Sequence, residues 1–353
     1  MYAAILLAAY FALCWYTITE MIDLFEKMKV YSLIMSLRIV QTYAGVVFVA
    51  FTIISSNLSD RKIRKLYGDL EEVDEKLKLL NVRFDYGKAM RRDVFHLLEI
   101  TIFTVIFNLL EYFPFVGPET TGFFDLVWLV NSLPQFVNSL AITNFVIVIA
   151  KIRRRLEAIN EFIPSLMIVE KNTVTSTLEI ETNNVFRLKL LNRIHEKLIG
   201  AATLLNDSHG PVLLMSFVVY FLTACAHTRT IYFNAGDNTQ SVDLLVEFLW
   251  LIFVLGKYIY VVDACHSIFL RCQVKRSGQL IYDKLTDSEY HLLKQEADSM
   301  ARRVESRSLQ LTACNFFVID YSILKMIFVG LVVYGFLIAS FSNISGATKT
   351  KEM

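Results

Sequence analysis

Residues 31–55, YSLIMSLRIVQTYAGVVFVAFTIIS, and the link that follows at 57–93, NLSDRKIRKLYGDLEEVDEKLKLLNVRFDYGKAMRRD, decide the fold of this chain. The first stretch is apolar and long enough to cross about 30 Å of hydrocarbon as a helix, which takes about 20 residues. The link carries ten Lys and Arg residues, from Arg61 to Arg92. Loops with an excess of Lys and Arg stay in the cytoplasm. The pair therefore predicts a transmembrane helix whose carboxyl end faces the cytoplasm.

The rest of the chain alternates apolar stretches with links of unequal charge in the same way. The links after the fourth and sixth stretches hold nine and eight Lys and Arg residues, whereas the links after the third and fifth hold none. The seven stretches are Tyr2–Thr19, Tyr31–Ser55, Val94–Phe113, Phe123–Ala150, Pro211–Phe233, Asp243–Arg271 and Phe316–Ser342. We therefore predict one all-α membrane unit over residues 1–353, with seven transmembrane helices, a cytoplasmic N-terminus, an extracellular C-terminus and long cytoplasmic helical extensions. This orientation is the reverse of that of a G-protein-coupled receptor.

The composition agrees with a multi-pass membrane protein and argues against other classes. Apolar residues make up 55% of the chain and the mean hydropathy is +0.46, whereas soluble domains are roughly 45–50% apolar. A net charge of +1 argues against a nucleic-acid partner. The first stretch lacks the basic n-region and the small-residue cleavage site of a signal peptide, which favours a transmembrane helix there.

The sequence shows no catalytic or metal-binding pattern. Its five cysteines fall in or beside the apolar stretches without a CxxC spacing, which is typical of small buried side chains rather than of disulfides or a zinc site. The six histidines are scattered, and no GxSxG, HExxH or phosphate-loop motif occurs. We therefore expect this protein not to be an enzyme and to hold no cofactor and no metal.

Two cytoplasmic segments, 183–206 and 287–309, have the apolar period of amphipathic helices. They precede the transmembrane segments at 211–273 and 316–342, which they extend toward the cytoplasm. Apolar side chains recur at Val185, Leu188, Leu191, Ile194, Leu198, Ala201 and Leu205 in the first, and at Leu293, Ala297, Met300 and Val304 in the second. Such stripes need a partner, which could be each other, the membrane face or another subunit. Residues 169–184, rich in Thr, Asn and Glu, are expected to form a flexible loop.

A ligand that arrives from outside must bind among the helices, because the predicted extracellular links are short. Polar and aromatic side chains lie in the outer halves of the third to sixth predicted helices. They are Glu111, Trp128, Asn131, Gln135, His227, Arg229, Glu247 and Trp250. A charge in a transmembrane helix costs about 2.5–3.5 kcal/mol on insertion scales, so it should face the bundle interior or a wet cavity. We interpret the set as a ligand pocket; a buried ion pair of Arg229 with Glu111 or Glu247 is the alternative.

Three further residues in these helices have structural interpretations. Pro134 is expected to kink the fourth helix and to open space for the pocket. Lys257 and Asp263, both in the sixth helix, are assigned to packing or to helix pairing. These residues are therefore not counted among the candidate ligand contacts.

The last helix carries a recognisable motif. Residues 313–320, ACNFFVID, and 333–341, VYGFLIASF, resemble the seventh helix of insect gustatory receptors. That family typically reads small-x-x-Phe-Phe-x-Ile-Asp, followed by Thr-Tyr, five apolar residues and Gln-Phe. The matching residues are Phe317, Asp320, Tyr334 and Phe341, whereas Val333 replaces the usual Thr and Ser340 the usual Gln. Asn206-x-x-His209-Gly210 also resembles the family.

The resemblance implies a ligand-gated, non-selective cation channel in the plasma membrane of a sensory neuron, at its dendrite. In that family four subunits surround one pore lined by the seventh helix, and cytoplasmic helices anchor the tetramer, the role that 183–206 and 287–309 would take here. The implied partners are a small-molecule tastant, permeant cations, the lipid bilayer and further subunits of the same or another kind. Because Ser340 offers a hydroxyl where the family has an amide, ion selectivity stays open.

One face of the last helix is suited to line a pore. Val333, Leu337, Ser340 and Phe341 follow one another at i, i+4, i+7 and i+8, so they fall on the same side. Apolar rings at a constriction block ions by dewetting. We therefore expect Leu337 and Phe341 to form the closed gate; ordinary helix packing is the alternative.

Two other functions stay open at this point. The chain could be a seven-helix chemoreceptor that signals through cytoplasmic partners, or a non-conducting regulatory subunit of a heteromeric receptor. The ligand itself is not specified. Gly335 stands where the sugar-receptor branch tends to carry an acidic residue, which favours bitter or other tastants over sugars.

Overall fold

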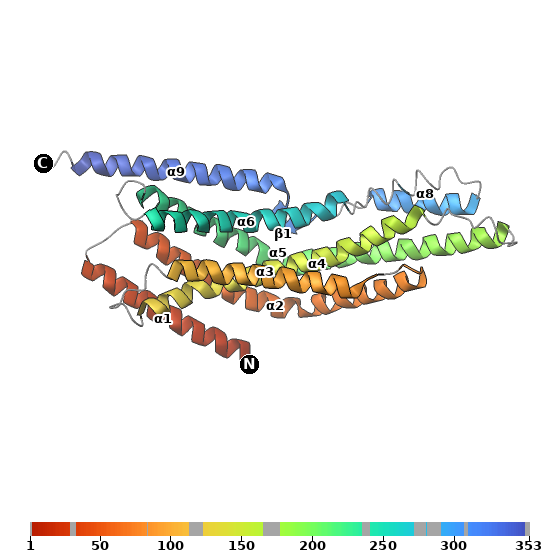
Figure 1. Cartoon of the computed structure of the whole chain (residues 1–353), viewed down its shortest axis with the longest axis horizontal. Helices are drawn as coiled ribbons and strands as arrows, with labels where there is room; N and C mark the ends of the chain where they lie inside the picture. The colour runs from red at the N-terminus through yellow and green to blue at the C-terminus, as the bar shows by residue number, and fades with distance from the viewer. Residues whose placement is uncertain are drawn as a thin grey trace.

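The helices of this chain lie side by side along one long axis (Figure 1). The computed structural model describes residues 2–28, 33–82, 84–112, 123–164, 177–234, 241–271, 280, 291–306 and 310–349. Its helices are α1 (Tyr2–Met28), α2 (Leu33–Leu79), α3 (Tyr86–Tyr112), α4 (Phe123–Phe162), α5 (Thr177–Asn234), α6 (Ser241–Arg271), α8 (His291–Ser306) and α9 (Tyr321–Lys349). Two short strands, β1 (Thr312–Ala313) and β2 (Phe317–Val318), pair antiparallel. The predicted all-α architecture is confirmed, with one small hairpin added to it.

Each of the seven predicted apolar stretches contains a helix. Within the described residues, α2, α3, α4, α5, α6 and α9 are long and apolar enough to cross a membrane. Helix α1 has 27 residues and packs against its neighbours, where the Tyr10 hydroxyl donates a hydrogen bond to the Val130 carbonyl of α4 (3.1 Å). The chain thus provides seven long helices at the positions that the apolar stretches predict.

The direction of the helices alternates along the bundle. The carboxyl ends of α2, α4 and α6 point to one end of the molecule, on the right in Figure 1, and those of α1, α3, α5 and α9 point to the other. The links rich in Lys and Arg follow the apolar stretches of α2, α4 and α6 in the sequence and include the extensions of these helices at that end, so we call it the basic end. The alternation of charged and uncharged links therefore corresponds to two opposite ends of one bundle.

The apolar stretches and the amphipathic segments next to them form continuous helices. Helices α2, α4 and α5 have 47, 40 and 58 residues, much more than the roughly 20 that a membrane requires. Helix α5 continues through Pro211. It begins at Thr177, so the prediction of a loop through residue 184 was wrong for its second half. The weak helix propensity of Thr and Asn is overridden because Asn184, Leu188 and Leu191 are buried in the bundle.

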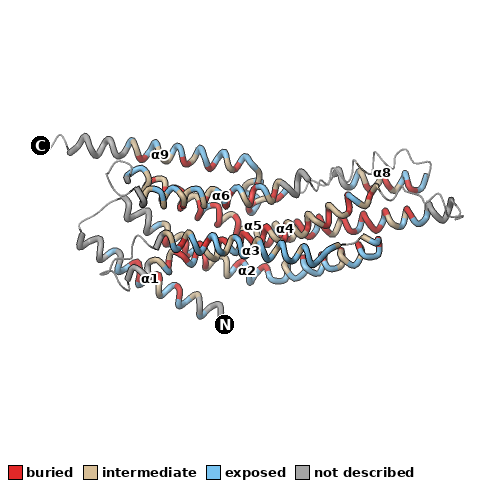
Figure 2. Tube along the Cα trace, in the orientation of Figure 1, coloured by how far each residue is buried: buried red, intermediate tan, exposed pale blue. Residues whose placement is uncertain are grey.

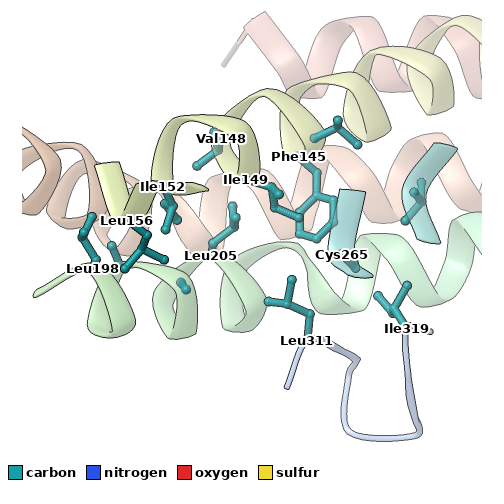
Figure 3. Packing of buried hydrophobic residues seen from close by; sticks show 14 of the residues in the cluster. Phe145, Val148, Ile149, Ile152, Leu156, Leu198, Leu205, Cys265, Leu311 and Ile319 are labelled. Carbon is teal, nitrogen blue, oxygen red and sulfur yellow. The ribbon is translucent and has the colours of Figure 1, made fainter. Parts of the chain in front are cut away.

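The core is concentrated toward the basic end, along α4 and α5. Buried apolar side chains of α4 face those of α5, as Figure 3 shows for Ile152 and Leu205, and Leu311, directly before the hairpin, belongs to the same cluster. In Figure 2 the buried positions gather on α4 and α5, whereas most of α3 and α9 is exposed. The apolar stripes of α5 and α8 are covered within the chain, since Leu198 and Met300 are both fully buried. Of the partners considered for these stripes, packing on each other is therefore the one observed.

Ion pairs between helices reinforce this core. Arg155 of α4 donates to Asp74 of α2 through two parallel hydrogen bonds, Nε to Oδ1 (2.7 Å) and Nη2 to Oδ2 (2.6 Å), and both side chains are almost buried. Lys197 of α5 donates to Asp69 and Glu72 of α2. Hydrogen bonds from Lys197 and Lys76 lower the pKa of Glu72 to about 2. These contacts fix α2 against α4 and α5 beyond the membrane-spanning part of the bundle.

The last helix begins later than predicted. Residues 316–320 were expected to be helical, but they form β2 and the end of a hairpin, and α9 begins at Tyr321. The turn places Cys314 and Asn315 at positive φ (53° and 61°), which interrupts any helix. Asp320 then caps α9, since its Oδ1 accepts from the backbone N–H of Ser322 (2.9 Å). Hydrogen bonds from Ser322 also hold the pKa of Asp320 below its usual range.

Candidate functional site

An aromatic cluster joins three helices near the end of the bundle opposite the basic end. His227 of α5 and Glu247 of α6 form a hydrogen bond between Nδ1 and Oε2 (2.5 Å). The His227 ring stacks on Trp250 with a centroid distance of 5.5 Å and an interplanar angle of 6°. Phe107 of α3 and Phe253 of α6 complete the cluster by packing on Trp250 and on each other. Three of the eight predicted ligand residues are therefore brought together here.

A buried lysine continues the cluster toward the middle of the bundle. The Lys257 ammonium lies over the rings of Phe253 (4.2 Å) and Tyr220 (5.0 Å). It donates to Ser139 Oγ of α4 (2.7 Å), which also receives a hydrogen bond from Thr104 of α3 (3.2 Å). The interpretation of Lys257 as a helix-pairing residue is supported by these contacts. The same contacts place it one step from the aromatic cluster, through Phe253.

The other predicted ligand residues are distributed over several interfaces. Trp128 Nε1 donates to the Asn108 carbonyl of α3 (2.8 Å). Asn131 faces α2 instead, where its Oδ1 accepts from Thr42 (3.0 Å). Gln135 is buried in α4, four residues before Ser139, which donates to the Gln135 carbonyl (2.7 Å). The backbone of Glu111 belongs to α3, but its side chain lies outside the part of the chain whose side chains the structure describes.

Arg229 does not form the ion pair with Glu247 that was the alternative to a pocket. Glu247 pairs with His227, whereas the Arg229 guanidinium lies over the Phe233 ring (5.0 Å) and within electrostatic range of Tyr334 in α9. Arg229 lies two residues after His227, and at 3.6 residues per turn such positions point about 160° apart. The two side chains therefore serve different interfaces of α5, one toward α6 and one toward α9.

Several polar atoms around the aromatic cluster are buried without a hydrogen-bond partner. These are Asn108 Oδ1, Gln135 Oε1 and Trp250 Nε1. A buried unpaired polar group costs about 1–3 kcal/mol, and such groups in a native protein call for a partner such as water or a ligand. A cavity of about 10 Å³ beside Tyr220 and Lys257 has room for about one water. Acceptors and donors are both present, so a bound molecule needs an apolar body with a few polar groups.

The predicted pore residues lie on an uncovered side of α9. Val333 and Leu337 are each 51% exposed, and Ser340 is exposed as well. An adjacent face packs on α5 and α6 through Ile327, Leu331 and other apolar side chains. Phe341 belongs to α9, but its side chain lies outside the described ones. The helix therefore has an apolar surface that no other described part of the chain covers.

The hairpin before α9 is fastened to α5 by Asn206. The side-chain Oδ1 of Asn206 accepts from the backbone N–H of Thr312 (2.7 Å), and its Nδ2 donates to Thr312 Oγ1 (3.2 Å). Gly210 lies one turn further along α5, where a Cβ would be 3.1 Å from the Cys314 nitrogen. Only glycine lets the turn approach the helix so closely. Both residues belong to the Asn-x-x-His-Gly pattern, which is thus explained by this contact.

Replacing Asn206 with alanine is expected to loosen the hairpin and the start of α9. The substitution leaves the Thr312 N–H without its acceptor, at a cost of about 1–3 kcal/mol, directly before the first turn of α9. We expect a lower melting temperature of the purified protein and faster proteolysis at the hairpin. Asn206→Asp is the matched control, since it retains the acceptor; equal behaviour of the two variants would contradict this role.

Sequence reasoning missed part of this site. Phe107, Phe253, Tyr220 and Ser139 are ordinary residues of apolar helices, and no spacing marks them as neighbours of Trp250 or Lys257. Their contacts join positions far apart in the chain, such as Ser139 and Lys257, which are 118 residues apart.

Within the described residues, no group of His, Cys, Asp and Glu side chains could hold a metal ion.

Comparisons with known proteins agree with this architecture. The sequence profile of a family described as 7tm Chemosensory receptor matches residues 1–338. The structure is similar to that of the insect olfactory receptor OR5 from Machilis hrabei, with a TM-score of 0.65, 14% sequence identity and coverage of 94% of this chain and 87% of that chain. The structure of the same receptor in complex with eugenol gives a TM-score of 0.65, 12% identity and coverage of 95% and 88%. No curated protein sequence matches this chain significantly.

Proposed function

This chain belongs to the 7tm chemosensory receptor family, and from that premise we propose that it is a gustatory receptor, a non-selective cation channel opened by a small tastant. The observation that carries the proposal is the set of buried polar atoms without partners around the aromatic cluster. A tastant with an apolar body and a few polar groups would satisfy them. The related olfactory receptor OR5 has a structure in complex with eugenol, a molecule of this kind.

The proposed orientation places the basic end in the cytoplasm. The links that follow the second, fourth and sixth apolar stretches hold ten, nine and eight Lys and Arg residues, most of them on the helical extensions at this end, and such segments are retained inside. The aromatic cluster then lies in the outer half of the membrane, where a tastant enters from the extracellular side. The C-terminus after α9 is extracellular in this orientation, and the site of action is the plasma membrane of a sensory neuron.

The proposed pore is lined by α9 in an assembly of four subunits. Its support is the apolar surface of α9 around Val333 and Leu337, which the described part of the subunit leaves uncovered. A face of this kind is expected where copies of one helix surround a central axis. The long helices at the basic end, including residues 183–206 of α5 and α8, would form the anchor between subunits.

Excised membrane patches test the channel against the alternatives. A tastant found by a calcium-flux panel should evoke current in patches that contain this chain alone and no GTP. A receptor that signals through cytoplasmic partners gives no current under these conditions. A regulatory subunit gives current only when a second receptor subunit is expressed with it.

In the same recordings, Gln135→Ala and Trp250→Phe are expected to raise the half-maximal tastant concentration about tenfold each. Each substitution removes one unpaired polar atom at the site, and a lost hydrogen bond to a ligand is worth roughly 1.4 kcal/mol, or one decade in affinity. Leu133→Ala is the matched control, since this side chain of α4 is exposed. Unchanged dose–response curves with normal surface expression in both variants would remove the support for a pocket here.

A further inference from the structure

We propose that a cleft between α2, α3 and α4 at the basic end binds the headgroup of an anionic membrane phospholipid. The cleft has a volume of about 530 Å³, within the range of 300–1,000 Å³ typical of ligand pockets. Tyr67 of α2, Val94 of α3 and Lys151 of α4 each contribute to its wall. It shares no residue with the aromatic cluster, so it is a second site, and the inference does not depend on which tastant opens the channel.

The cleft straddles the boundary of the hydrocarbon layer. On α3, Val94 is the first residue of the apolar stretch that enters the membrane; on α4, Lys151 is the first residue after the apolar stretch that leaves it. Two helices thus place the boundary independently, and both boundary residues line the same cleft. A molecule bound there has one end among apolar side chains and the other among charges, as a membrane lipid requires.

One end of the cleft is apolar and the other is charged, which matches the acyl chain and the headgroup of a lipid. Val94, Leu97 and Ile147 form its wall on the membrane side, where an acyl chain can lie. Val94 and Leu97 of α3 are exposed at the cleft, which leaves the bound chain open to the bilayer. The remaining wall, away from the membrane, contains charged and aromatic side chains.

Two of the three cationic side chains in the wall of the cleft are paired with carboxylates, and the third, Lys151, can bind an anion. Arg154 pairs with Asp93 (2.7 Å) and Arg155 with Asp74 (2.6 Å). Lys151 makes no ion pair with any described residue, and its ammonium lies 5.5 Å from the centre of the Tyr67 ring. A lysine held at the cytoplasmic boundary between transmembrane helices is suited to a lipid phosphate.

Other groups near Lys151 favour an anionic lipid over a zwitterionic one. Lys88, Arg91 and Arg92 are exposed on the same part of α3, and Asp85, directly before this helix, is the exposed carboxylate, so the cations outnumber the anions on this stretch beside the cleft. Glu71 also lines the cleft without an ion pair among the described residues. Its carboxylate can accept from a headgroup that carries donors beside its phosphate, such as the ammonium of phosphatidylserine or the hydroxyls of phosphatidylinositol.

A bound lipid would hold α3 against the bundle. Among the described helices that are long and apolar enough to cross a membrane, α3 is the least buried in the subunit, with 11% of its most apolar segment covered. A headgroup in contact with α2 and α4 and an acyl chain along α3 add the contacts that this helix lacks. Binding of an anionic phospholipid should therefore stabilise the subunit.

Binding to the purified full-length receptor tests the proposal, with native mass spectrometry and thermal unfolding as readouts. Dioctanoyl phosphatidylserine is expected to bind and to raise the melting temperature. Dioctanoyl phosphatidylcholine should bind at least tenfold more weakly. Inorganic phosphate and glycerophosphoserine, which lack acyl chains, should give no stabilisation; if they stabilise as well as the lipid, the site is one for soluble phosphate and the proposal is overturned.

Lys151→Gln is expected to weaken phosphatidylserine binding about tenfold. Lys62→Gln, which removes an exposed positive charge of α2 outside the cleft, should leave binding unchanged. Leu97→Trp fills the membrane side of the cleft and should reduce binding without a change of charge. Wild-type affinity in Lys151→Gln, or an equal loss in Lys62→Gln, would show that the lipid is held by general surface charge. Because these readouts need no current, they are separable from a failure of the proposed channel function.

Discussion

Replacing Asp74 with alanine should abolish most surface expression of the protein, the largest effect on stability that we expect from one substitution. The change leaves the Arg155 guanidinium almost buried and without the carboxylate to which it donates two hydrogen bonds. Removing one partner of a buried ion pair costs about 3–5 kcal/mol, a large share of the 5–15 kcal/mol by which proteins are typically stable. Surface labelling of intact cells and size-exclusion chromatography after heating measure the loss.

A second substitution distinguishes the unpaired charge from lost packing. The double variant Asp74→Leu with Arg155→Met replaces the pair by apolar side chains of similar volume, and such replacements are often neutral. We expect it to recover much of the expression that Asp74→Ala loses. The exposed pair of Asp60 and Arg64 in the same helix is the matched control, and Asp60→Ala should have little effect. If Asp60→Ala were as damaging as Asp74→Ala, burial of the pair would not be the cause.

Leu337→Ala is expected to open the channel without ligand. The substitution removes three side-chain carbons from the proposed gate, which at about 0.8 kcal/mol for each buried carbon takes about 2 kcal/mol per subunit from the closed state. A shift of this size raises the open fraction more than tenfold. It also widens the apolar constriction that keeps water and ions out. The measurement is the standing current in cells that express the variant at a normal surface level.

Phe328→Ala is the control for the gate. Phe328 precedes Leu337 by nine residues, which at 3.6 residues per turn places it on the opposite side of α9. It is also exposed in the subunit, so its truncation removes a comparable apolar surface from the other flank of the helix. We expect no standing current from it. A current in Phe328→Ala with none in Leu337→Ala would place the pore on the other flank.

The membrane-spanning helices could be predicted from the sequence because their signal is local. An apolar stretch of about 20 residues has one stable form in a bilayer, and all seven stretches contain helices in the structure. The amphipathic period of residues 183–206 likewise predicts the helix that is found there as part of α5. The period also identifies buried positions, such as Leu198 and Met300, since side chains three and four residues apart share a face.

The hairpin before α9 could not be predicted in this way. Its two strands have two residues each, too few for an alternating pattern, and Phe316 and Phe317 look like the first turn of an apolar helix. What stops the helix is the left-handed turn at Cys314 and Asn315, together with the hydrogen bonds from distant Asn206. Asn206 and the start of the hairpin are 106 residues apart in the sequence, and no local pattern indicates that they are in contact.

Pairings between helices were equally beyond a reading of the sequence. Arg229 and His227 lie two residues apart on α5 and point to different sides, so either one, but not both, could have faced Glu247. In the structure Glu247 forms a hydrogen bond with His227. Lys257 donates to a hydroxyl group rather than to a carboxylate. Such choices depend on the rotation of each helix against its neighbours, which is a property of the packed bundle and not of any single stretch.

The proline within α5 has a mechanical consequence. At 1.5 Å per residue the 58 residues of this helix extend about 87 Å. One continuous helix therefore connects His227, near one end of the bundle, to the helices at the basic end. Pro211 lacks the amide hydrogen that an unbroken helix would use, and helices bend most easily at such a point. It adjoins Gly210, on which the hairpin rests. A ligand that tilted the part of α5 after Pro211 would therefore bend this helix next to the hairpin, so the bend would be transmitted directly to the first turn of α9.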